Sequence, residues 1–236
     1  MTYIFMIAGK GSRLQPLTLL SPKSMYMLDE HTSVFQRMVM LIRRYDPEAT
    51  IVAVTGFMHD KVEQSISGVH FVYNPFYAVT NSMGSLWCAR EYLNDNNVVL
   101  LNGDIVVSEN MMRDIVCQKT ERPVMLVDGS IKEGGDYNVQ VSNGRIVVMG
   151  KDLDTCYGEY VGITKLDGET LKPYRTELEK MVENGLYTQW FEDVLMQMIF
   201  KNNFDLYYED VVGCPWTEID CVNDLIKAKQ IHEGSC

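Results

Sequence analysis

The sequence predicts an α/β fold of the Rossmann-like kind, with a mixed, mainly parallel sheet and helices on both of its faces. Short apolar runs alternate with helical patterns through the first half of the chain, as they do where buried strands are joined by crossover helices. In the second half of the chain, paired β-rich runs replace this alternation and predict a small hairpin and helical region. The 236 residues suffice for one domain with a sizeable core.

The first half, about residues 1–128, is predicted to be the nucleotide-binding half. Its strands and helices follow one another in the order typical of a doubly wound sheet. In chain order we expect a strand at 3–8, a helix at 33–45, a strand at 50–56, a short helical segment at 59–66, a strand at 69–73, a helix at 83–93, a strand at 97–104 and a helix at 108–119.

The second half, about residues 129–236, is predicted to complete the sheet and to build the wall of a pocket. After a strand at 123–130, the β-rich runs 136–141 and 145–150 flank Asn143-Gly144, a strong hairpin signal. We then expect helices at 168–185, broken near Pro173, and at 189–202, a strand at 204–211 and a closing helix at 222–232. The whole chain, 1–236, is therefore expected to form a single domain.

The chain is acidic. A formal net charge of -11 would repel a phosphate backbone, so we expect neither nucleic acid nor an anionic membrane surface as a partner. The N-terminal apolar run is too short for a signal peptide, and no run approaches the length of a spanning helix. We therefore expect a cytoplasmic protein without membrane insertion, and a homodimer is left open.

The loop after the first predicted strand is locally cationic. It carries Lys10, Arg13 and Lys23 and no acid between residues 8 and 25. In open α/β sheets this loop is the usual place for phosphates, and glycines let backbone N–H groups approach a ligand. We therefore predict a nucleotide-binding loop made of Ala8, Gly9, Gly11, Ser12, Arg13 and Lys23.

Two familiar nucleotide motifs do not fit this loop. No Gly-Lys-Ser/Thr follows at the spacing of a Walker A loop, and Leu14 occupies the third glycine position of G-x-G-x-x-G. On the glycines alone, a turn with solvated cations explains the loop equally well.

A longer string decides between these interpretations. "AGKGSRLQPLT" and then "PKSM" resemble the G-x-G-x-R-L-x-P-L-T…P-K signature of the sugar-nucleotide pyrophosphorylase and nucleotidyltransferase family. "YNPFYAVTNSMGSLWCAREYL" is similar to the base-reading segment of small cytidylyltransferases, including phosphocholine cytidylyltransferases. "LLNGDIVV", "WFEDVL" and "WTEIDCVNDL" extend the resemblance over nearly the whole chain. One departure is Ile7, where this family usually has a small residue under the nucleotide.

The resemblance implies a nucleotide-diphospho-sugar transferase fold and an enzyme that moves CMP from CTP to a small phosphorylated or phosphonate acceptor, with Mg²⁺ as cofactor and release of pyrophosphate. Asp104 and Asp220 would hold the metal. Taken singly, an aspartate after a strand is more often a turn or helix-cap residue, and the flanking family motifs reverse this. Arg13 would bind the β- and γ-phosphates, and Lys23 would bridge nucleotide and acceptor. Arg13, Lys23 and Asp104 are thus the predicted catalytic residues.

The resemblance also implies where the base binds. Base contacts are expected from Asn81, Ser82, Gly84 and Ser85, with Gly84 letting the backbone approach the pyrimidine edge. The alternative is a simple helix start capped by Asn81 or Ser82, and the two interpretations are compatible.

Acids interleaved with aromatic rings predict the acceptor site. Such surroundings suit an amine or ammonium group through cation-π attraction and charge pairing, and Lys151 is reserved for the acceptor phosphate. The alternatives are that the aromatic residues belong to the core and that Lys151 is a surface lysine. The predicted acceptor residues are Asp136, Tyr137, Lys151, Glu159, Trp190, Phe191, Glu192 and Asp193.

Other functions remain open beside cytidylyl transfer to an acceptor such as phosphocholine. One is a sugar-1-phosphate nucleotidyltransferase that makes a UDP-, dTDP- or GDP-sugar. A nucleotide-sugar-dependent glycosyltransferase could share the sheet and a metal aspartate, but it would not need the R-L-x-P-L-T…P-K loop. A non-catalytic nucleotide sensor would keep the loop and lack one of the two metal carboxylates.

Overall fold

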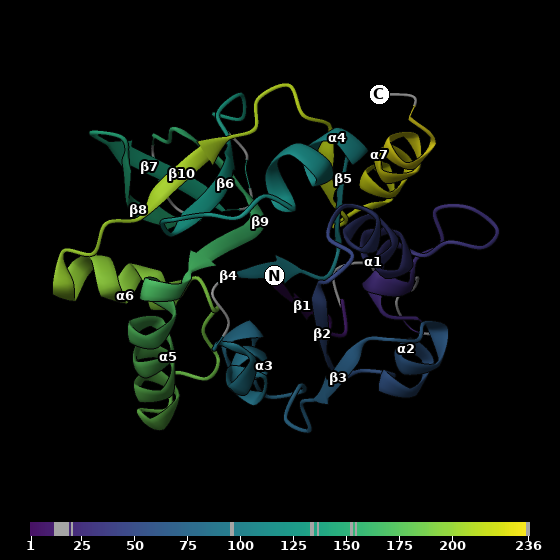
Figure 1. Ribbon diagram of the computed structural model, residues 1–236, viewed down its shortest axis with the longest axis horizontal. Helices are drawn as coiled ribbons and strands as arrows, with labels where there is room; N and C mark the ends of the chain where they lie inside the picture. The colour runs from purple at the N-terminus through teal and green to yellow at the C-terminus, as the bar shows by residue number, and fades with distance from the viewer. Residues whose placement is uncertain are drawn as a thin grey trace.

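The computed structural model describes residues 1–11, 19, 21–94, 97–132, 135, 137–151, 153 and 155–234. Its central sheet has the strand order β10-β6-β9-β4-β1-β2-β3, and β7 and β8 extend it from β9 (Figure 1). The strands are β1 Thr2–Met6, β2 Thr50–Thr55, β3 His70–Tyr73, β4 Asn97–Asn102, β5 Ile105–Val107, β6 Val124–Asp128, β7 Asn138–Ser142, β8 Arg145–Gly150, β9 Gly158–Asp167, β10 Tyr207–Asp210 and β11 Trp216–Glu218.

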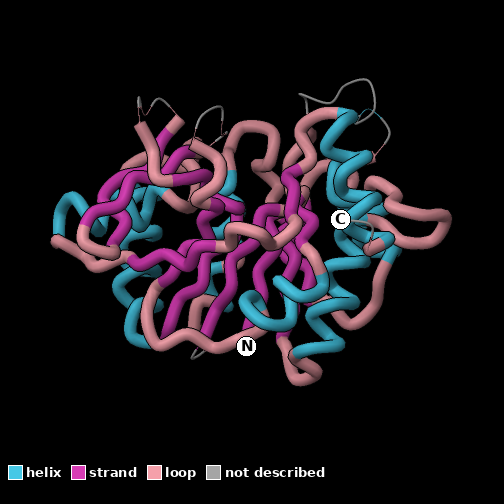
Figure 2. The backbone as a smooth tube through the Cα atoms, turned by 90° about the horizontal axis from the view of Figure 1, so that it is seen from above, coloured by secondary structure: helices cyan, strands magenta, loops and turns pink. Residues whose placement is uncertain are grey.

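The predicted fold class is confirmed. Strand β1 pairs in parallel with β2 and β4, and β9 runs antiparallel between β4 and β6. Figure 2 shows the strands gathered in the middle of the molecule with helices around them. The helices are α1 Val34–Tyr45, α2 His59–Ser65, α3 Ser82–Cys88, α4 Glu109–Met111, α5 Gly168–Glu183, α6 Asp193–Asn202 and α7 Val222–Glu233.

Each face of the sheet carries its own core, because successive strand residues point to opposite faces. Ile4 of β1 packs with the buried residues of α3, α5 and α6. Tyr3 and Phe5, on either side of it in the chain, pack with α1 and the segment after β5. These two cores fix the positions of β1 and β4. The opening loop begins at the end of β1.

The predicted hairpin forms, with β7 and β8 paired in antiparallel fashion. Asn143 and Gly144 have φ angles of 50° and 76°. Asparagine and glycine tolerate this left-handed region, which a two-residue hairpin turn requires.

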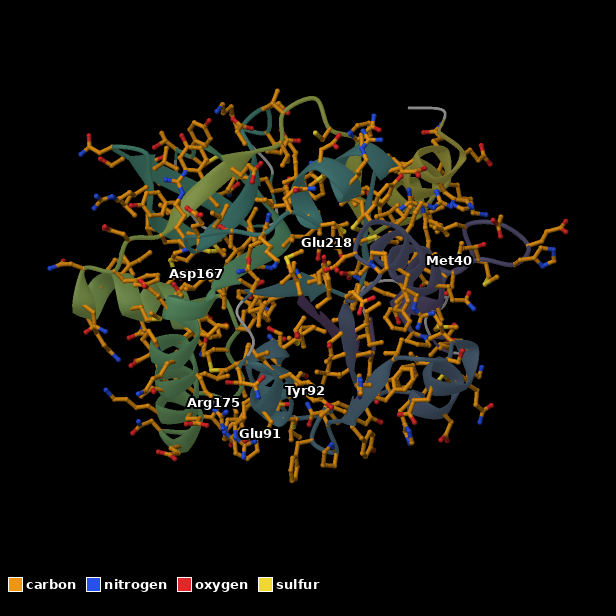
Figure 3. The ribbon with its side chains drawn as sticks, in the orientation of Figure 1. Met40, Glu91, Tyr92, Asp167, Arg175 and Glu218 are labelled. Carbon is orange, nitrogen blue, oxygen red and sulfur yellow. The ribbon has the colours of Figure 1, made fainter. Side chains whose placement is uncertain are left out.

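Helix α5 corrects one prediction. It runs without a break from Gly168 to Glu183 with Pro173 inside it. A proline removes one backbone hydrogen bond, but the helix is held at both sides of that point. Asp167 caps its first turn by accepting from the backbone N–H of Glu169 at 3.0 Å, and Arg175 binds Glu91 at 2.7 Å (Figure 3).

A short ribbon of β5 and β11 brings distant parts of the chain together. The two strands pair in antiparallel fashion with Ile105 opposite Glu218, and the N–H of Ile219 donates to the carbonyl of Asp104 at 3.0 Å. Residue 104 and residue 220 therefore lie close together. Among the described helices, none combines the length and the apolar character needed to cross a bilayer.

Candidate active site

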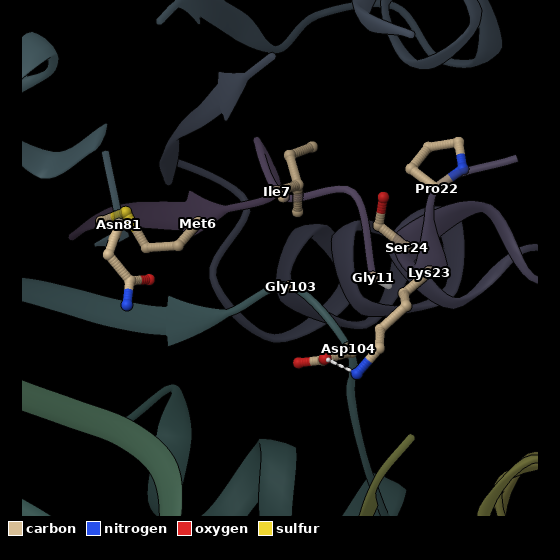
Figure 4. A pocket seen from close by; sticks show the side chains of 10 residues that line it. Met6, Ile7, Gly11, Pro22, Lys23, Ser24, Asn81, Gly103 and Asp104 are labelled. Atoms are coloured by element: carbon tan, nitrogen blue, oxygen red, sulfur yellow. Dashed lines mark hydrogen bonds and ion pairs between the residues drawn. The ribbon is translucent and has the colours of Figure 1, made fainter. Parts of the chain in front are cut away.

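A cavity of about 280 Å³ opens at the carboxyl ends of β1 and β4, where ligands bind in open α/β sheets. Of the predicted nucleotide residues, Gly9, Gly11, Lys23 and Asn81 line it. Ser12 and Arg13 lie outside the described residues. The full lining is Met6, Ile7, Gly9, Gly11, Pro22, Lys23, Ser24, Asn81, Gly103 and Asp104 (Figure 4).

Lys23 joins the two predicted metal carboxylates. It lies on a 3-10 turn, Lys23–Met25, after Pro22. Its Nζ donates to Asp104 Oδ2 at 3.0 Å (Figure 4). The same Nζ also donates to Asp220 Oδ1. Burial disfavours the lysine's charge, yet the two carboxylates outweigh it and raise the pKa of Lys23. A stable positive charge is thus held between two acids.

The same two carboxylates fit a magnesium ion. Mg²⁺ prefers hard oxygen ligands and is commonly held by one or two carboxylates together with substrate phosphates. Asp104 and Asp220 already bind one cation, the ammonium of Lys23. In the part of the chain that the structure describes, no three histidine, cysteine or carboxylate side chains gather into a metal-binding cluster.

Ile7 forms part of the floor of this cavity, and its branched side chain is only 4% exposed. A Cβ on Gly103 would lie 2.3 Å from Ile7 Cγ2 and 2.6 Å from the Met6 carbonyl. Gly103 is therefore required for the ends of β1 and β4 to approach each other with isoleucine at position 7.

A second cavity, of about 200 Å³, continues from the first. The two share Met6, Gly9, Asn81, Gly103 and Asp104. The other residues that line the second cavity are Ala8, Tyr77, Thr80, Ser82, Ser85, Asn102, Trp190, Glu192 and Glu218.

Three of the four predicted base-binding residues line this second cavity, namely Asn81, Ser82 and Ser85. Gly84 is the exception: a Cβ there would lie 2.7 Å from Thr80 Cβ, and the residue lines a neighbouring apolar pocket. Its glycine character serves the packing of α3 on Thr80 rather than the approach of a base.

A third cavity, of about 70 Å³, is here called the acceptor-side cavity. It shares Asn102, Trp190, Glu192 and Glu218 with the second cavity, so the two are neighbours. Figure 3 places Glu218 near the middle of the molecule. The lining residues are Asn102, Tyr137, Lys151, Tyr160, Trp190, Glu192 and Glu218.

Three of the predicted acceptor residues hold one another in place around this cavity. Tyr137 and Trp190 meet edge to face, with ring centroids 5.1 Å apart. Asp193 accepts from the Tyr137 hydroxyl at 3.2 Å and from the Trp190 backbone N–H at 3.1 Å. Lys151 Nζ lies over the Trp190 ring, 4.8 Å from its centroid. Asp193 therefore positions the two rings instead of facing the cavity.

Glu192 is a buried acid in the cavity wall, only 4% exposed. Burial raises its pKa to about 8, and the charge of Asp193 adds to this effect, while its own backbone N–H and Tyr160 oppose it. Burial also raises the pKa of Asp193. The free site therefore disfavours the charged form of this carboxyl.

Two predicted acceptor residues are corrected, and one cannot be placed. Phe191 has no exposed surface and belongs to the core, so its ring is not available to a ligand. Glu159 is not among the cavity-lining residues, whereas Tyr160 is, because neighbouring residues of a strand point to opposite faces. Asp136 lies outside the described residues.

Sequence reasoning missed Asn102, Tyr77 and Thr80 as site residues. Asn102 ends β4 two positions before Asp104, and period-two alternation places the two on the same side, so that signal was available. Tyr77 and Thr80 lie in the loop between β3 and α3, and no periodicity marks them.

Comparisons with known proteins agree with the fold. The family described as "MobA-like NTP transferase domain" matches residues 3–135. Choline-phosphate cytidylyltransferase of Streptococcus pneumoniae is 25% identical over 238 residues, which cover 98% of each chain. CTP:phosphoglutamine cytidylyltransferase of Campylobacter jejuni is 23% identical over 251 residues, covering 95% of this chain and 98% of the relative. The solved structure of the CTP:phosphocholine cytidylyltransferase from Streptococcus pneumoniae superposes with a TM-score of 0.79 at 20% identity, over 98% of both chains.

Proposed function

Because the chain belongs to the family of MobA-like NTP transferase domains, we propose that it transfers CMP from CTP to a small acceptor. The acceptor carries a phosphate or phosphonate and an amine or ammonium group, and the reaction is magnesium-dependent. The observation that carries the proposal is the position of Lys23, Asp104 and Asp220. Lys23 and Asp104 line the cavity beside the opening loop, and Asp220 is held to them by Lys23. Asp104 and Gly103 also line the second cavity, which shares Asn102 and two glutamates with the acceptor-side cavity.

The proposed reaction is an in-line substitution at phosphorus. An oxygen of the acceptor phosphate attacks the α-phosphorus of the nucleotide, and a P–O–P linkage forms. The bond to the β-phosphate oxygen breaks, and its electron pair leaves with pyrophosphate. Because the acceptor oxygen is already an anion, no general base is needed. Catalysis then depends on positioning and on charge neutralisation.

Lys23 supplies that charge between the two substrates. Its ammonium leaves the two carboxylates for the phosphates, and Arg13 is predicted to bind the β- and γ-phosphates. Magnesium, when held by Asp104 and Asp220, would neutralise the phosphate oxygens. The glycines of the loop, Gly9 and Gly11, present backbone N–H groups to the same phosphates.

Two arguments support cytidine and a cationic acceptor. The two curated relatives described above carry cytidylyltransferase names, and both are aligned over nearly this whole chain. The acceptor-side cavity combines Glu192 and Glu218 with the rings of Tyr137 and Trp190, which suits an ammonium better than a neutral sugar. A cytoplasmic location and a homodimer stay predictions.

A nucleotide and acceptor panel tests the proposal through pyrophosphate release. With magnesium and phosphoethanolamine, 2-aminoethylphosphonate or phosphocholine, CTP should react faster than UTP or dTTP. Equal rates with UTP would remove the base assignment and leave the reaction class intact. Faster turnover with glucose 1-phosphate than with every cationic acceptor would favour the sugar-nucleotide alternative.

A further inference from the structure

We propose that the acceptor-side cavity takes a primary ammonium group and discriminates against a trimethylammonium group. The inference rests on the proposed function and narrows its acceptor. It is carried by three features of the cavity: the oxygen atoms in its wall, the contacts already made by its aromatic rings, and its size.

Oxygen acceptors surround the cavity. Asn102, Glu192 and Glu218 all contribute to its lining and end in oxygen-bearing groups. A primary ammonium has three N–H donors and can satisfy such groups with charge-assisted hydrogen bonds. A trimethylammonium has no N–H donor. It would therefore add no hydrogen bond to these oxygens, whereas a primary ammonium would add charge-assisted ones.

The aromatic rings of the cavity already make contacts with other side chains. Lys151 Nζ lies 4.8 Å from the centroid of the Trp190 ring, which is cation-π distance. The Tyr137 and Trp190 rings meet at 81°, so the edge of one covers a face of the other. An aromatic cage for a quaternary ammonium needs open ring faces. Here a bulky cation would have to displace Lys151.

The cavity is also small. Its volume is about 70 Å³, compared with about 280 Å³ and about 200 Å³ for the other two cavities of the site. A primary ammonium is about as large as water, while each N-methyl group replaces a donated hydrogen with a carbon.

The electrostatics of Glu192 are consistent with a hydrogen-bonding cation. Its pKa is raised to about 8 mainly by burial, so a donor with positive charge at its carboxyl would favour the ionised form. The titratable groups that act on it or share its cavity are Asp193, Tyr137, Tyr160, Tyr174, Glu218 and Lys151. The cation among these is Lys151, and its Nζ lies over the Trp190 ring.

A methylation series tests the inference on the full chain. Phosphoethanolamine, its N-methyl and N,N-dimethyl derivatives and phosphocholine differ only in methyl groups. We expect the Kd from calorimetry and the acceptor KM from pyrophosphate release to rise with each methyl. Across the series the rise should be about ten- to a hundredfold, the worth of one or two charge-assisted hydrogen bonds.

Several outcomes would overturn it. These are a flat series, tightest binding by phosphocholine, binding of none of the four, or equal binding of the neutral 2-hydroxyethyl phosphate. Failure of the proposed function is a separate result. In that case no acceptor releases pyrophosphate, while the order of the dissociation constants still decides which ammonium the cavity takes.

A matched pair of variants locates the discrimination. Glu192→Gln keeps the shape of the wall and removes its charge, so it should shrink the ratio between phosphoethanolamine and phosphocholine severalfold. Glu177→Gln removes another buried carboxylate, on α5, which lies away from the cavity. The Glu177 carboxylate binds Lys201 of α6 at 2.9 Å. That variant should keep the full ratio. An unchanged ratio in both variants would refute the role of Glu192.

Discussion

At the residue scale, Lys23 occupies the position that a metal ion is predicted to take. Its ammonium binds Asp104 and Asp220, and it cannot at the same time bind the phosphates of a nucleotide. Asp104 and Asp220 would hold a divalent ion by their carboxylates, and Lys23, released from them, would then be able to bind the phosphates. The lysine thus keeps two acids together before the substrates arrive.

Lys23→Met should separate metal binding from catalysis. Without the competing ammonium, Mn²⁺ should bind the nucleotide-free protein roughly tenfold more tightly in a paramagnetic-resonance titration. Turnover should fall by about a hundred- to a thousandfold, the usual cost of losing one preorganised charge at a developing anion.

Two variants serve as controls for that pair of effects. Asp104→Ala should lose both metal binding and turnover with little change in folding stability. Lys10→Met removes a cation that lies 5.7 Å from the Tyr77 ring centroid, away from both carboxylates, and should leave Mn²⁺ binding unchanged. Weaker Mn²⁺ binding by Lys23→Met would contradict the competition between Lys23 and the metal ion.

Glu192 predicts a pH dependence of stability. Its pKa rises from an ordinary value of 4.5 to about 8 in the folded protein, mainly through burial. Between pH 4.5 and about pH 8 the folded state therefore binds more protons than the unfolded state. The resulting contribution of Glu192 to the free energy of unfolding is full below pH 4.5 and is lost as the pH rises through about 8. The decline should be on the order of a few kcal/mol.

Thermal or urea unfolding of the wild type and of Glu192→Gln, from about pH 5 to about pH 9, measures this. Glutamine resembles the protonated acid and does not titrate, so the variant should lose less stability over the range. Asp193 titrates in both proteins, so the difference between the curves reports Glu192 together with its electrostatic coupling to Asp193. Parallel curves for the two proteins would show that Glu192 stays ionised in the free enzyme.

At the element scale, α5 shows why a local rule failed. Pro173 predicts a break, yet the helix runs on, with Leu171, Tyr174 and Leu178 buried in the core on one face. The Tyr174 hydroxyl also donates to the carbonyl of Phe191 at 3.0 Å. Tertiary packing along this face outweighs the single hydrogen bond that proline removes.

Pro173→Ala should therefore stabilise the protein. It restores a backbone N–H near the carbonyl of Glu169, with an expected gain of about 1–2 kcal/mol after the loss of proline's restriction of the unfolded chain. Denaturant unfolding measures the gain, with the exposed Lys172→Ala as a neutral reference within about 0.5 kcal/mol. A destabilised Pro173→Ala would mean that the ring's own packing holds the helix.

At the scale of the whole molecule, the site lies where the two halves of the chain meet. The first half supplies the glycine loop and the end of β4, and the second half supplies Trp190, Glu192 and the β11 strand. The alternation of strands and helices and the hairpin were predictable because apolar periodicity and Asn143-Gly144 are local signals.

The acceptor wall was only partly predictable. Its composition of acids and aromatic rings is visible in the sequence, but which side chain of each pair faces the cavity is not. Trp190 faces it while Phe191 fills the core, and Tyr160 faces it while Glu159 does not. The pairing of β5 with β11 joins residues more than a hundred positions apart, and no local pattern reveals such a contact.

Phosphorus NMR of the full chain with CTP, magnesium and phosphoethanolamine would follow cytidylyl transfer directly. CTP should disappear as pyrophosphate and an asymmetric diphosphate diester appear in equal amounts, and neither should form with Asp104→Ala. Unchanged CTP, or its hydrolysis to CMP or CDP without a diester that contains the acceptor, would contradict cytidylyl transfer to this acceptor.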